Sequence, residues 1–211
     1  MDSEIASGGV VKFLNWLKEN GHFENEITGI EMACGKGRNC IWLAKQGVIM
    51  TGFDFSMSAI KEAKRRTRKS GSSYKLKFLV LDATRKWPYK FGSFDFIIDC
   101  FATTDIESVK SRKFAVSEIK RVLKSNGHLL VYSLSTDDEF HKEMVKKNPA
   151  NEKGAFINPI SGKFEKTFDR DELVNLYDEL KLVAEDRVKK VERFFGKNYK
   201  CKHHWMVFQK A

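Results

Sequence analysis

The sequence predicts an α/β fold: a doubly wound, mostly parallel sheet with helices on both faces. Strand-like apolar runs alternate along the chain with segments whose apolar residues recur at helical spacing. Three successive strand-like runs end on an acidic residue, namely Glu31, Asp54 and Asp82. Because the carboxyl ends of strands in an open parallel sheet line one crevice, we expect these three carboxylates to converge on one edge.

A lead-in helix is the first predicted element. Apolar residues recur at mostly helical spacing between Ser7 and Asn20, and Gly21 provides a stop.

The first strand-like run ends at Glu31 and is followed by two closely spaced glycines, Gly35 and Gly37, where a second helix opens. Without a Cβ, the backbone of these glycines takes unusual dihedrals and a ligand can lie against the main chain. The first amides of the helix stay free to donate. The pattern indicates a nucleotide-binding turn, although a purely structural connection uses the same residues.

The next two strands repeat this pattern. Residues 48–53 form an apolar run that stops at Asp54, about one βαβ unit after the glycine turn, where a ribose-binding acid belongs. A third helix begins near Ser58. Residues 76–81 then form a strand that ends at Asp82.

The second half of the chain is less regular. We expect a fourth strand over 92–99, a helix over 108–123, a turn at Asn126 and Gly127 before the fifth strand, a helix over 170–180 capped by Asp169, and strands near 183–188 and 204–209. Proline, glycine and asparagine turn signals crowd the segment 136–164, which we interpret as a substrate-side insertion.

Composition fits one soluble domain. The chain has 211 residues, 42% of them hydrophobic, enough for one sizeable core. It carries no apolar run long enough to span a bilayer and no signal-peptide pattern at its N-terminus. We therefore expect a cytoplasmic protein with no membrane partner.

The cysteines and histidines give no metal signal. Cys34, Cys40, Cys100 and Cys201 form no Cys-x-x-Cys pair and no zinc-like spacing. Adjacent His203 and His204 would point to opposite faces of a strand. The sequence therefore predicts no metal site.

The net charge of +10 raises the question of an anionic partner. The charge is densest in the third helix, where Lys61, Lys64, Arg65 and Arg68 recur at helical spacing. No aromatic residues alternate with these side chains, which favours a solvated face over an RNA-binding stripe.

The strings Glu31 to Asn39, Gly52 to Ser56 and Asp82–Ala83 resemble the class I S-adenosylmethionine-dependent methyltransferases, and the resemblance continues through 92–99 and 121–131. The string Cys34 to Asn39 is similar to that of small tellurite-resistance-like or thiol-methyltransferase-like members. Ala33 departs from the family, because many members carry a glycine there. A nicotinamide dinucleotide fold is the competing interpretation, but it requires Gly or Ala where position 40 is Cys.

The resemblance implies a seven-stranded sheet closed by an antiparallel C-terminal hairpin, in a single methyltransferase domain over 1–211. Within it we expect a lead-in or lid helix over 1–21, a cofactor-binding core over 22–135, the insertion over 136–168, and the last helix and hairpin over 169–211. Ser7, Gly8 and Gly9 of the lid would touch the ligand when it closes.

The resemblance also implies the site residues. The cofactor would be held by Glu31, Ala33, Cys34, Gly35, Gly37, Arg38, Asn39, Asp54, Phe55, Asp82, Ala83 and Cys100. Glu31 would meet the methionine ammonium region, Asp54 both ribose hydroxyls, and Asp82 with the Ala83 amide the adenine edge, on which Phe55 would stack. Cys34 and Cys100 are interpreted as wall residues rather than nucleophiles.

Methyl transfer from a sulfonium is an in-line displacement that requires mainly positioning and water exclusion. Phe101, Thr104 and Asp105 would face the acceptor, with Asp105, His141 and His203 as candidate general bases. The run Asp99 to Thr103 lacks the Asn/Asp-Pro-Pro-Phe/Tyr string of some amino-methylating members.

We therefore expect methylation of a small thiol, metalloid, phenol or carboxylate, with S-adenosylhomocysteine as the product, by a monomer or homodimer. RNA methylation and a non-catalytic S-adenosylmethionine-binding sensor or partner subunit remain the alternatives.

Overall fold

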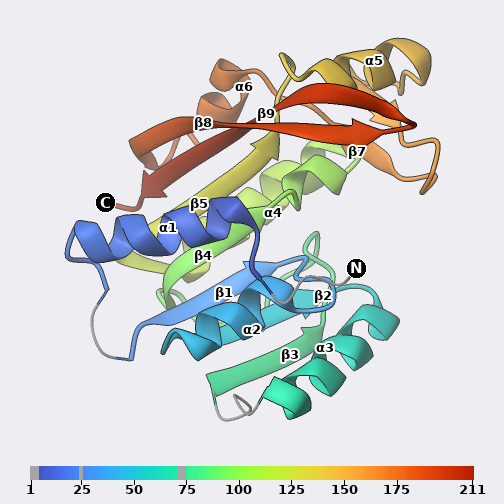
Figure 1. Cartoon of the computed structure of the whole chain (residues 1–211). Helices are drawn as coiled ribbons and strands as arrows, with labels where there is room; N and C mark the ends of the chain where they lie inside the picture. Colours follow the sequence, from blue (N-terminus) through green and yellow to red (C-terminus); the bar gives the residue numbers. More distant parts are fainter. Residues whose placement is uncertain (1–4, 24–25, 71–74) are drawn as a thin grey trace.

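A seven-stranded sheet in the order β3-β2-β1-β4-β5-β9-β8 runs through the middle of the molecule (Figure 1). The computed structural model describes residues 5–23, 26–70 and 75–211, so residues 1–4 of the predicted lid segment lie outside the described residues. The strands are β1 (Thr28–Met32), β2 (Ile49–Asp54), β3 (Leu76–Val80), β4 (Phe94–Cys100), β5 (Leu123–Leu134), β8 (Lys181–Phe194) and β9 (Lys197–Gln209). β1 to β5 run parallel, and β9 runs antiparallel to β5 and β8, which confirms the predicted sheet.

Helices cover both faces of the sheet. They are α1 (Gly8–Glu19), α2 (Arg38–Lys45), α3 (Met57–Ser70), α4 (Val109–Val122), α5 (Glu139–Lys147) and α6 (Arg170–Leu176). One core joins α1, α2 and α3 to strand residues that include Phe96 and Ile98, and the other joins α4 and α6 to residues that include Ile97. This alternation along β4 follows from the two-residue period of a strand, with both faces buried as in a parallel sheet.

The predicted helix 170–180 begins where expected and ends earlier. Asp169 forms a capping box, in which its side chain accepts from the Glu172 amide and the Glu172 side chain accepts from the Asp169 amide. The helix stops at Leu176, and the Leu180 amide then bonds to the Tyr177 carbonyl in a turn that buries both side chains.

The insertion is more regular than the sequence predicts. Residues 136–168 contain α5 and a two-stranded antiparallel sheet of β6 (Ala155–Ile157) and β7 (Phe164–Lys166). The structure has turns at the predicted glycines, because Gly154 and Gly162 take positive φ values of 75° and 69°. The sequence pattern does not predict α5, because its N-cap, Asp138, lies in a polar run. The Asp138 side chain accepts from the His141 amide at 2.9 Å.

The C-terminal hairpin is longer than the predicted strands 183–188 and 204–209. A two-residue turn with positive φ at Phe195 (48°) and Gly196 (78°) joins β8 to β9, as type I′ turns do. β9 pairs with β5 only from His203 to Gln209. The remainder extends toward the insertion (Figure 1), where Tyr199 and Cys201 pack with Phe140, Met144 and Phe156.

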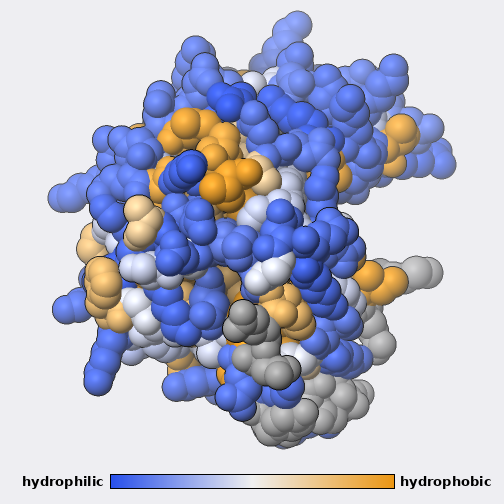
Figure 2. Space-filling model, turned by 90° about the vertical axis from the view of Figure 1, so that its left-hand side faces the viewer, coloured by the Kyte–Doolittle hydropathy of each residue, from blue (hydrophilic) through white to orange (hydrophobic). Residues whose placement is uncertain are grey.

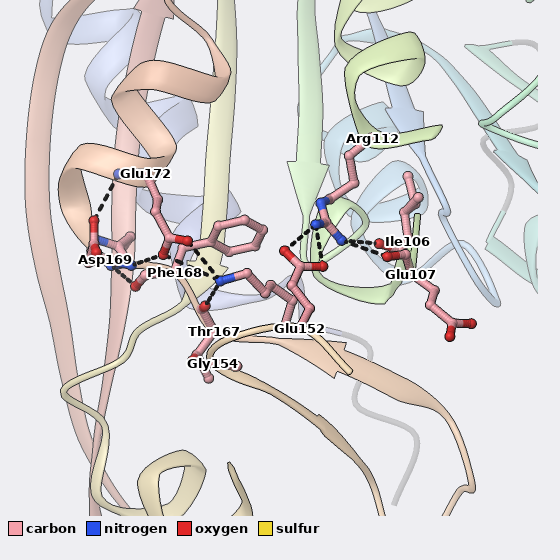
Figure 3. Close-up of polar contacts among 11 residues, drawn as sticks. Ile106, Glu107, Arg112, Glu152, Gly154, Thr167, Phe168, Asp169 and Glu172 are labelled. Atoms are coloured by element: carbon pink, nitrogen blue, oxygen red, sulfur yellow. Dashed lines mark hydrogen bonds and ion pairs between the residues drawn. The ribbon is translucent and has the colours of Figure 1, made fainter. Parts of the chain in front are cut away.

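Two buried cations link the insertion to α4 and α6 (Figure 3). Arg112 of α4 forms an ion pair with Glu152 of the insertion and donates to the carbonyls of Ile106 and Glu107. Lys166 of β7 donates to the Thr167 carbonyl at 2.7 Å and lies 3.1 Å from the Glu172 carboxylate. The insertion is therefore a docked cap rather than a loose surface loop.

The surface is mostly hydrophilic on the side that Figure 2 displays, with one compact hydrophobic patch in its upper half. Among the helices of the described residues, none combines the length and the apolar character that crossing a membrane requires.

Candidate active site

The three acidic strand ends meet on one edge of the sheet, as the sequence predicts. β2 lies beside β1 and β3, with Glu31 opposite Gly52 and Asp54 opposite Val80. Asp82 follows two residues after the end of β3.

The glycine turn between β1 and α2 has the expected backbone. Ala33, Gly35 and Gly37 take positive φ values of 53°, 54° and 75°. A Cβ on Gly37 would lie 2.6 Å from Phe78 Cζ, whereas one on Gly35 would meet no atom within 4 Å. Gly37 therefore serves close packing, while Gly35 leaves the inner side of the turn open for a ligand.

Glu31 is buried at the start of this turn. Asn39 Nδ2 donates to its Oε1 at 2.6 Å, and the Cys40 thiol donates to its Oε2 at 3.0 Å. Burial raises the pKa of Glu31 to about 7, against the lowering effect of Asn39, Cys40 and Arg38. A cation that arrives beside this carboxylate would stabilise its charged form.

Asp54 braces the same turn. Its Oδ2 accepts from the Gly35 amide at 2.9 Å, and its Oδ1 accepts from the Ser56 amide at 2.8 Å. Each carboxylate oxygen keeps a second lone pair for ligand hydroxyls.

A cavity of about 370 Å³ opens between the turn and the end of β4. It is lined by Glu31, Ala33, Cys34, Gly35, Lys36, Arg38, Asn39, Arg66, Cys100 and Phe101. Most of these were predicted; Lys36 and Arg66 were not. A larger hollow of about 870 Å³ lies between α1 and β8, away from the three acids.

The remaining predicted cofactor residues lie outside the lining of this cavity. Phe55 is 71% exposed, a position from which its ring can stack on a flat ligand. Asp82 accepts from the amide and hydroxyl of Thr84, each at 2.8 Å, and the Ala83 carbonyl accepts from the Trp87 indole.

The segment before α1 lies against the cavity. The Ser7 amide donates to Asn39 Oδ1 at 2.8 Å, and its hydroxyl lies 3.5 Å from Cys100 Sγ. Gly9 instead packs on the Tyr132 ring, and its carbonyl accepts from the Trp205 indole. Ser7 therefore contacts the cavity lining, whereas Gly8 lines the larger hollow between α1 and β8.

Asp99 fixes the chain where it leaves β4. This buried carboxylate accepts from the amides of Ala102 and Thr103 and from the hydroxyls of Thr103 and Tyr177. The next turn holds Phe101 at a φ of 65°. Such strain in a bulky residue persists only where the surroundings impose it, as is common at functional sites.

The predicted acceptor residues lie in different surroundings. Phe101 lines the cavity, whereas Thr104 is buried and its hydroxyl lies 3.3 Å from Ser133 Oγ rather than in the cavity. Asp105 ends the 3₁₀ turn η2 (Thr103–Asp105), which is in contact with β7 of the insertion. Desolvation, with a contribution from Glu165, raises the pKa of Asp105 to about 7, although its side chain remains accessible to solvent.

Burial also raises the pKa of the Cys100 thiol to about 12. Cys100 is therefore a neutral thiol at neutral pH, which suits a wall residue and not a nucleophile.

Three rings form an aromatic wall that runs inward from the cavity: Phe101 lines the cavity, and Tyr132 and His203 pack behind it in the interior. The Phe101 ring lies 4.8 Å from the Tyr132 ring and 5.2 Å from the His203 ring, and the Tyr132 hydroxyl lies 3.1 Å from His203 Nδ1. Burial lowers the pKa of His203 to about 4, so that its imidazole is neutral at pH 7. His141 and His203 are two candidate bases that lie far apart in the sequence. Their ring centroids lie 6.1 Å apart in the structure.

A family model described as a methyltransferase domain matches residues 23–195. The chain belongs to the methyltransferase-domain family. This match favours the methyltransferase interpretation over the nicotinamide dinucleotide fold. The placement among tellurite-resistance-like or thiol-methyltransferase-like members stays a prediction.

Two curated relatives each match part of the chain. An uncharacterized protein of Haemophilus influenzae is 32% identical over 139 residues, which cover 65% of this chain and 55% of that protein. A demethylmenaquinone methyltransferase of Beutenbergia cavernae is 34% identical over 107 residues, 51% of this chain and 40% of that protein. The chain thus spans about half the length of the curated relatives it matches.

The fold also matches solved structures. A structure described as a SAM-dependent methyltransferase of Methanosarcina mazei superposes with a TM-score of 0.80 at 22% identity, covering 92% of this chain and 97% of that one. At this identity, the likeness supports the fold alone.

Proposed function

We propose that the protein transfers the methyl group of S-adenosylmethionine to a small acceptor that carries a phenol or thiol. The observation that carries this proposal is the aromatic wall beyond Cys100. Phe101 lines the cavity, and Tyr132 and His203 are buried behind its ring. Buried aromatic edges suit a small flat or apolar molecule, whereas a nucleic acid strand needs an open basic groove.

The relatives add weight to a small acceptor. The Beutenbergia cavernae protein is named for demethylmenaquinone, a small molecule. This name supports a small molecule as the class of acceptor, and the proposal does not extend to the particular molecule.

In this proposal Glu31 holds the methionine ammonium, with Arg38 and Asn39 at the same end of the cofactor. Asp54 accepts both ribose hydroxyls, and Asp82 with the Ala83 amide meets the adenine edge. The methyl group then points toward Cys100 and Phe101, past which the aromatic wall begins.

The reaction needs little covalent help from the protein. A lone pair of the acceptor oxygen or sulfur forms the bond to the methyl carbon, while the carbon–sulfur bond breaks and its electron pair returns to sulfur, giving S-adenosylhomocysteine. The acceptor proton passes to Asp105, whose raised pKa of about 7 matches a general base at neutral pH.

Transfer of tritiated methyl groups tests the acceptor class. We expect label in phenols or thiols of a small-molecule panel and none in total RNA. Label in RNA alone would replace this proposal with RNA methylation. Cofactor binding with no transfer to either would favour the sensor.

Calorimetric binding of S-adenosylhomocysteine tests the cofactor site separately. Loss of two hydrogen bonds to a charged carboxylate in Asp54→Ala should weaken binding by about 100-fold. Asp178→Ala, an exposed acid after α6, is the matched control and should bind normally. Unchanged binding to Asp54→Ala would remove Asp54 from the site.

A further inference from the structure

Three side chains of metal-ligand type meet in the interior beside Tyr132. Asp138 and His141 come from the cap and first turn of α5, and His203 comes from β9. Their potential ligand atoms all lie within 4.8 Å of one another. The residues are 0%, 7% and 3% exposed, respectively. No local sequence pattern predicts this group, because His203 lies far along the chain from His141.

Hydrogen bonds fix the Asp138 carboxylate without exhausting it. Its Oδ1 accepts from the His141 amide at 2.9 Å, and its Oδ2 accepts from the Lys202 amide at 2.6 Å. One lone pair on each oxygen is left for another partner.

His141 supplies the observation that points to a ligand. Its Nδ1 lies 2.7 Å from Asp138 Oδ1, and this contact is the only polar one that the buried nitrogen makes among the described residues. Buried polar atoms are normally satisfied. A cation bonded to both atoms would satisfy them together.

His203 is oriented from the other side. The Tyr132 hydroxyl lies 3.1 Å from His203 Nδ1, which leaves Nε2 of the ring for a further bond. A partner on the second nitrogen is the usual way in which proteins orient a metal-binding imidazole.

We propose that Asp138, His141 and His203 bind a divalent transition-metal ion, with Zn²⁺ the preferred occupant. Two imidazoles and one carboxylate are the ligand types of Zn²⁺, at about 2.0–2.2 Å from the metal, and three protein ligands leave a fourth position open. Ligand atoms around such an ion lie about 3–3.5 Å apart, so His141 Nδ1 and Asp138 Oδ1, now 2.7 Å apart, would separate slightly, and any wider spacing, at most 4.8 Å, would close.

The location gives the ion two roles. It joins α5 of the insertion to β9 of the main sheet, and it lies behind the aromatic wall formed by Phe101, Tyr132 and His203. The second role rests on the proposed function, whereas the binding site itself does not.

Metal binding to the intact, EDTA-treated protein tests the site without any methyl transfer. We expect equilibrium dialysis to give one Zn²⁺ per chain and Co²⁺ to give visible d–d absorption. His141→Gln and His203→Gln should each lower the Zn²⁺ affinity at least 100-fold, and Tyr132→Phe about 10-fold. His22→Gln changes an exposed histidine elsewhere and should bind as the natural protein does.

A thermal melt with and without Zn²⁺ guards against variants that fail to fold. The ion should raise the melting temperature of the natural protein and of His22→Gln, and leave that of folded His141→Gln unchanged. Much less than one Zn²⁺ per folded chain, or equal affinity in both histidine variants and the natural protein, overturns the metal site. The acceptor proposal stands or falls separately, on the tritium assay.

Discussion

Glu31 shows how one buried carboxylate can make ligand binding depend on pH. The folded-state pKa of about 7 exceeds the ordinary value of 4.5, so the folded protein holds this proton more tightly than the unfolded chain does. The stabilisation from Glu31 is therefore complete below about pH 4.5 and is lost as pH rises through 7. A cofactor ammonium beside it reverses the preference, because opposite charge favours the ionised form.

Cofactor binding should therefore release a proton from Glu31. We expect the affinity for S-adenosylhomocysteine to rise by up to about tenfold per pH unit between about pH 5 and 7, and to flatten above. Calorimetry at pH 6 in buffers of different ionisation enthalpy measures the released proton. Glu31→Gln should release none, and an unchanged proton release in that variant would place the titrating group elsewhere.

The two glycines of the turn should respond differently to alanine. Gly37→Ala adds strain at a φ of 75° and puts a Cβ 2.6 Å from Phe78, so we expect a loss of about 3 kcal/mol in the free energy of unfolding. Gly35→Ala meets open space and should lose only about 1 kcal/mol. Urea unfolding of both variants measures the difference; equal losses would show that backbone strain alone governs the turn.

At the scale of elements, the insertion depends on ion pairs that the sequence could not reveal. The Arg112 side chain is only 4% exposed, and the partner that neutralises it, Glu152, lies 40 residues away along the chain. Removing one partner of a buried pair leaves an uncompensated charge, whereas an exposed pair contributes little.

Glu152→Gln should therefore lower the free energy of unfolding by about 3 kcal/mol. Glu179→Gln, which breaks the exposed pair with Lys120, should change it by less than about 1 kcal/mol. Urea unfolding at pH 7 compares the two. Similar values for both variants would mean that Arg112 is satisfied by the carbonyls of Ile106 and Glu107 alone.

The glycine turn and the two acids beside it could be predicted because they follow each other closely in sequence. Glu31 lies next to the end of β1, Asp54 ends the adjacent parallel strand β2, and the turn that begins at Ala33 lies between them. The interior group behind Phe101, by contrast, draws Tyr132, Asp138 and His203 from β5, the cap of α5 and β9. Their meeting depends on the register of β9 against β5, a long-range pairing that no local pattern encodes.

At the scale of the whole molecule, the net charge of +10 gives a general attraction to polyanions. Part of the predicted basic face is internally paired, because Arg65 and Arg66 both donate to Glu62. Among the side chains of this face whose burial is described, Lys61 and Lys64 are exposed lysines.

We expect single-stranded RNA to bind weakly and without being methylated. With about four phosphate contacts, affinity should fall about 50-fold between about 50 and about 200 mM salt. Lys61→Gln with Lys64→Gln should make this salt dependence shallower, as fluorescence anisotropy would measure. Tight binding that persists at the higher salt concentration would indicate a dedicated RNA site.

The place of β9 in the sheet has a consequence for the order of folding during synthesis. β9 follows every other strand in sequence, yet it lies between β5 and β8 and also supplies Tyr199 and Cys201 to the core of the insertion. Until the ribosome has released this segment, β5 has an open edge and α5 lacks its packing partner. Nascent chains that stop before Lys197 should therefore hold a partly formed sheet that chaperones recognise, and full protection should arrive in one late step.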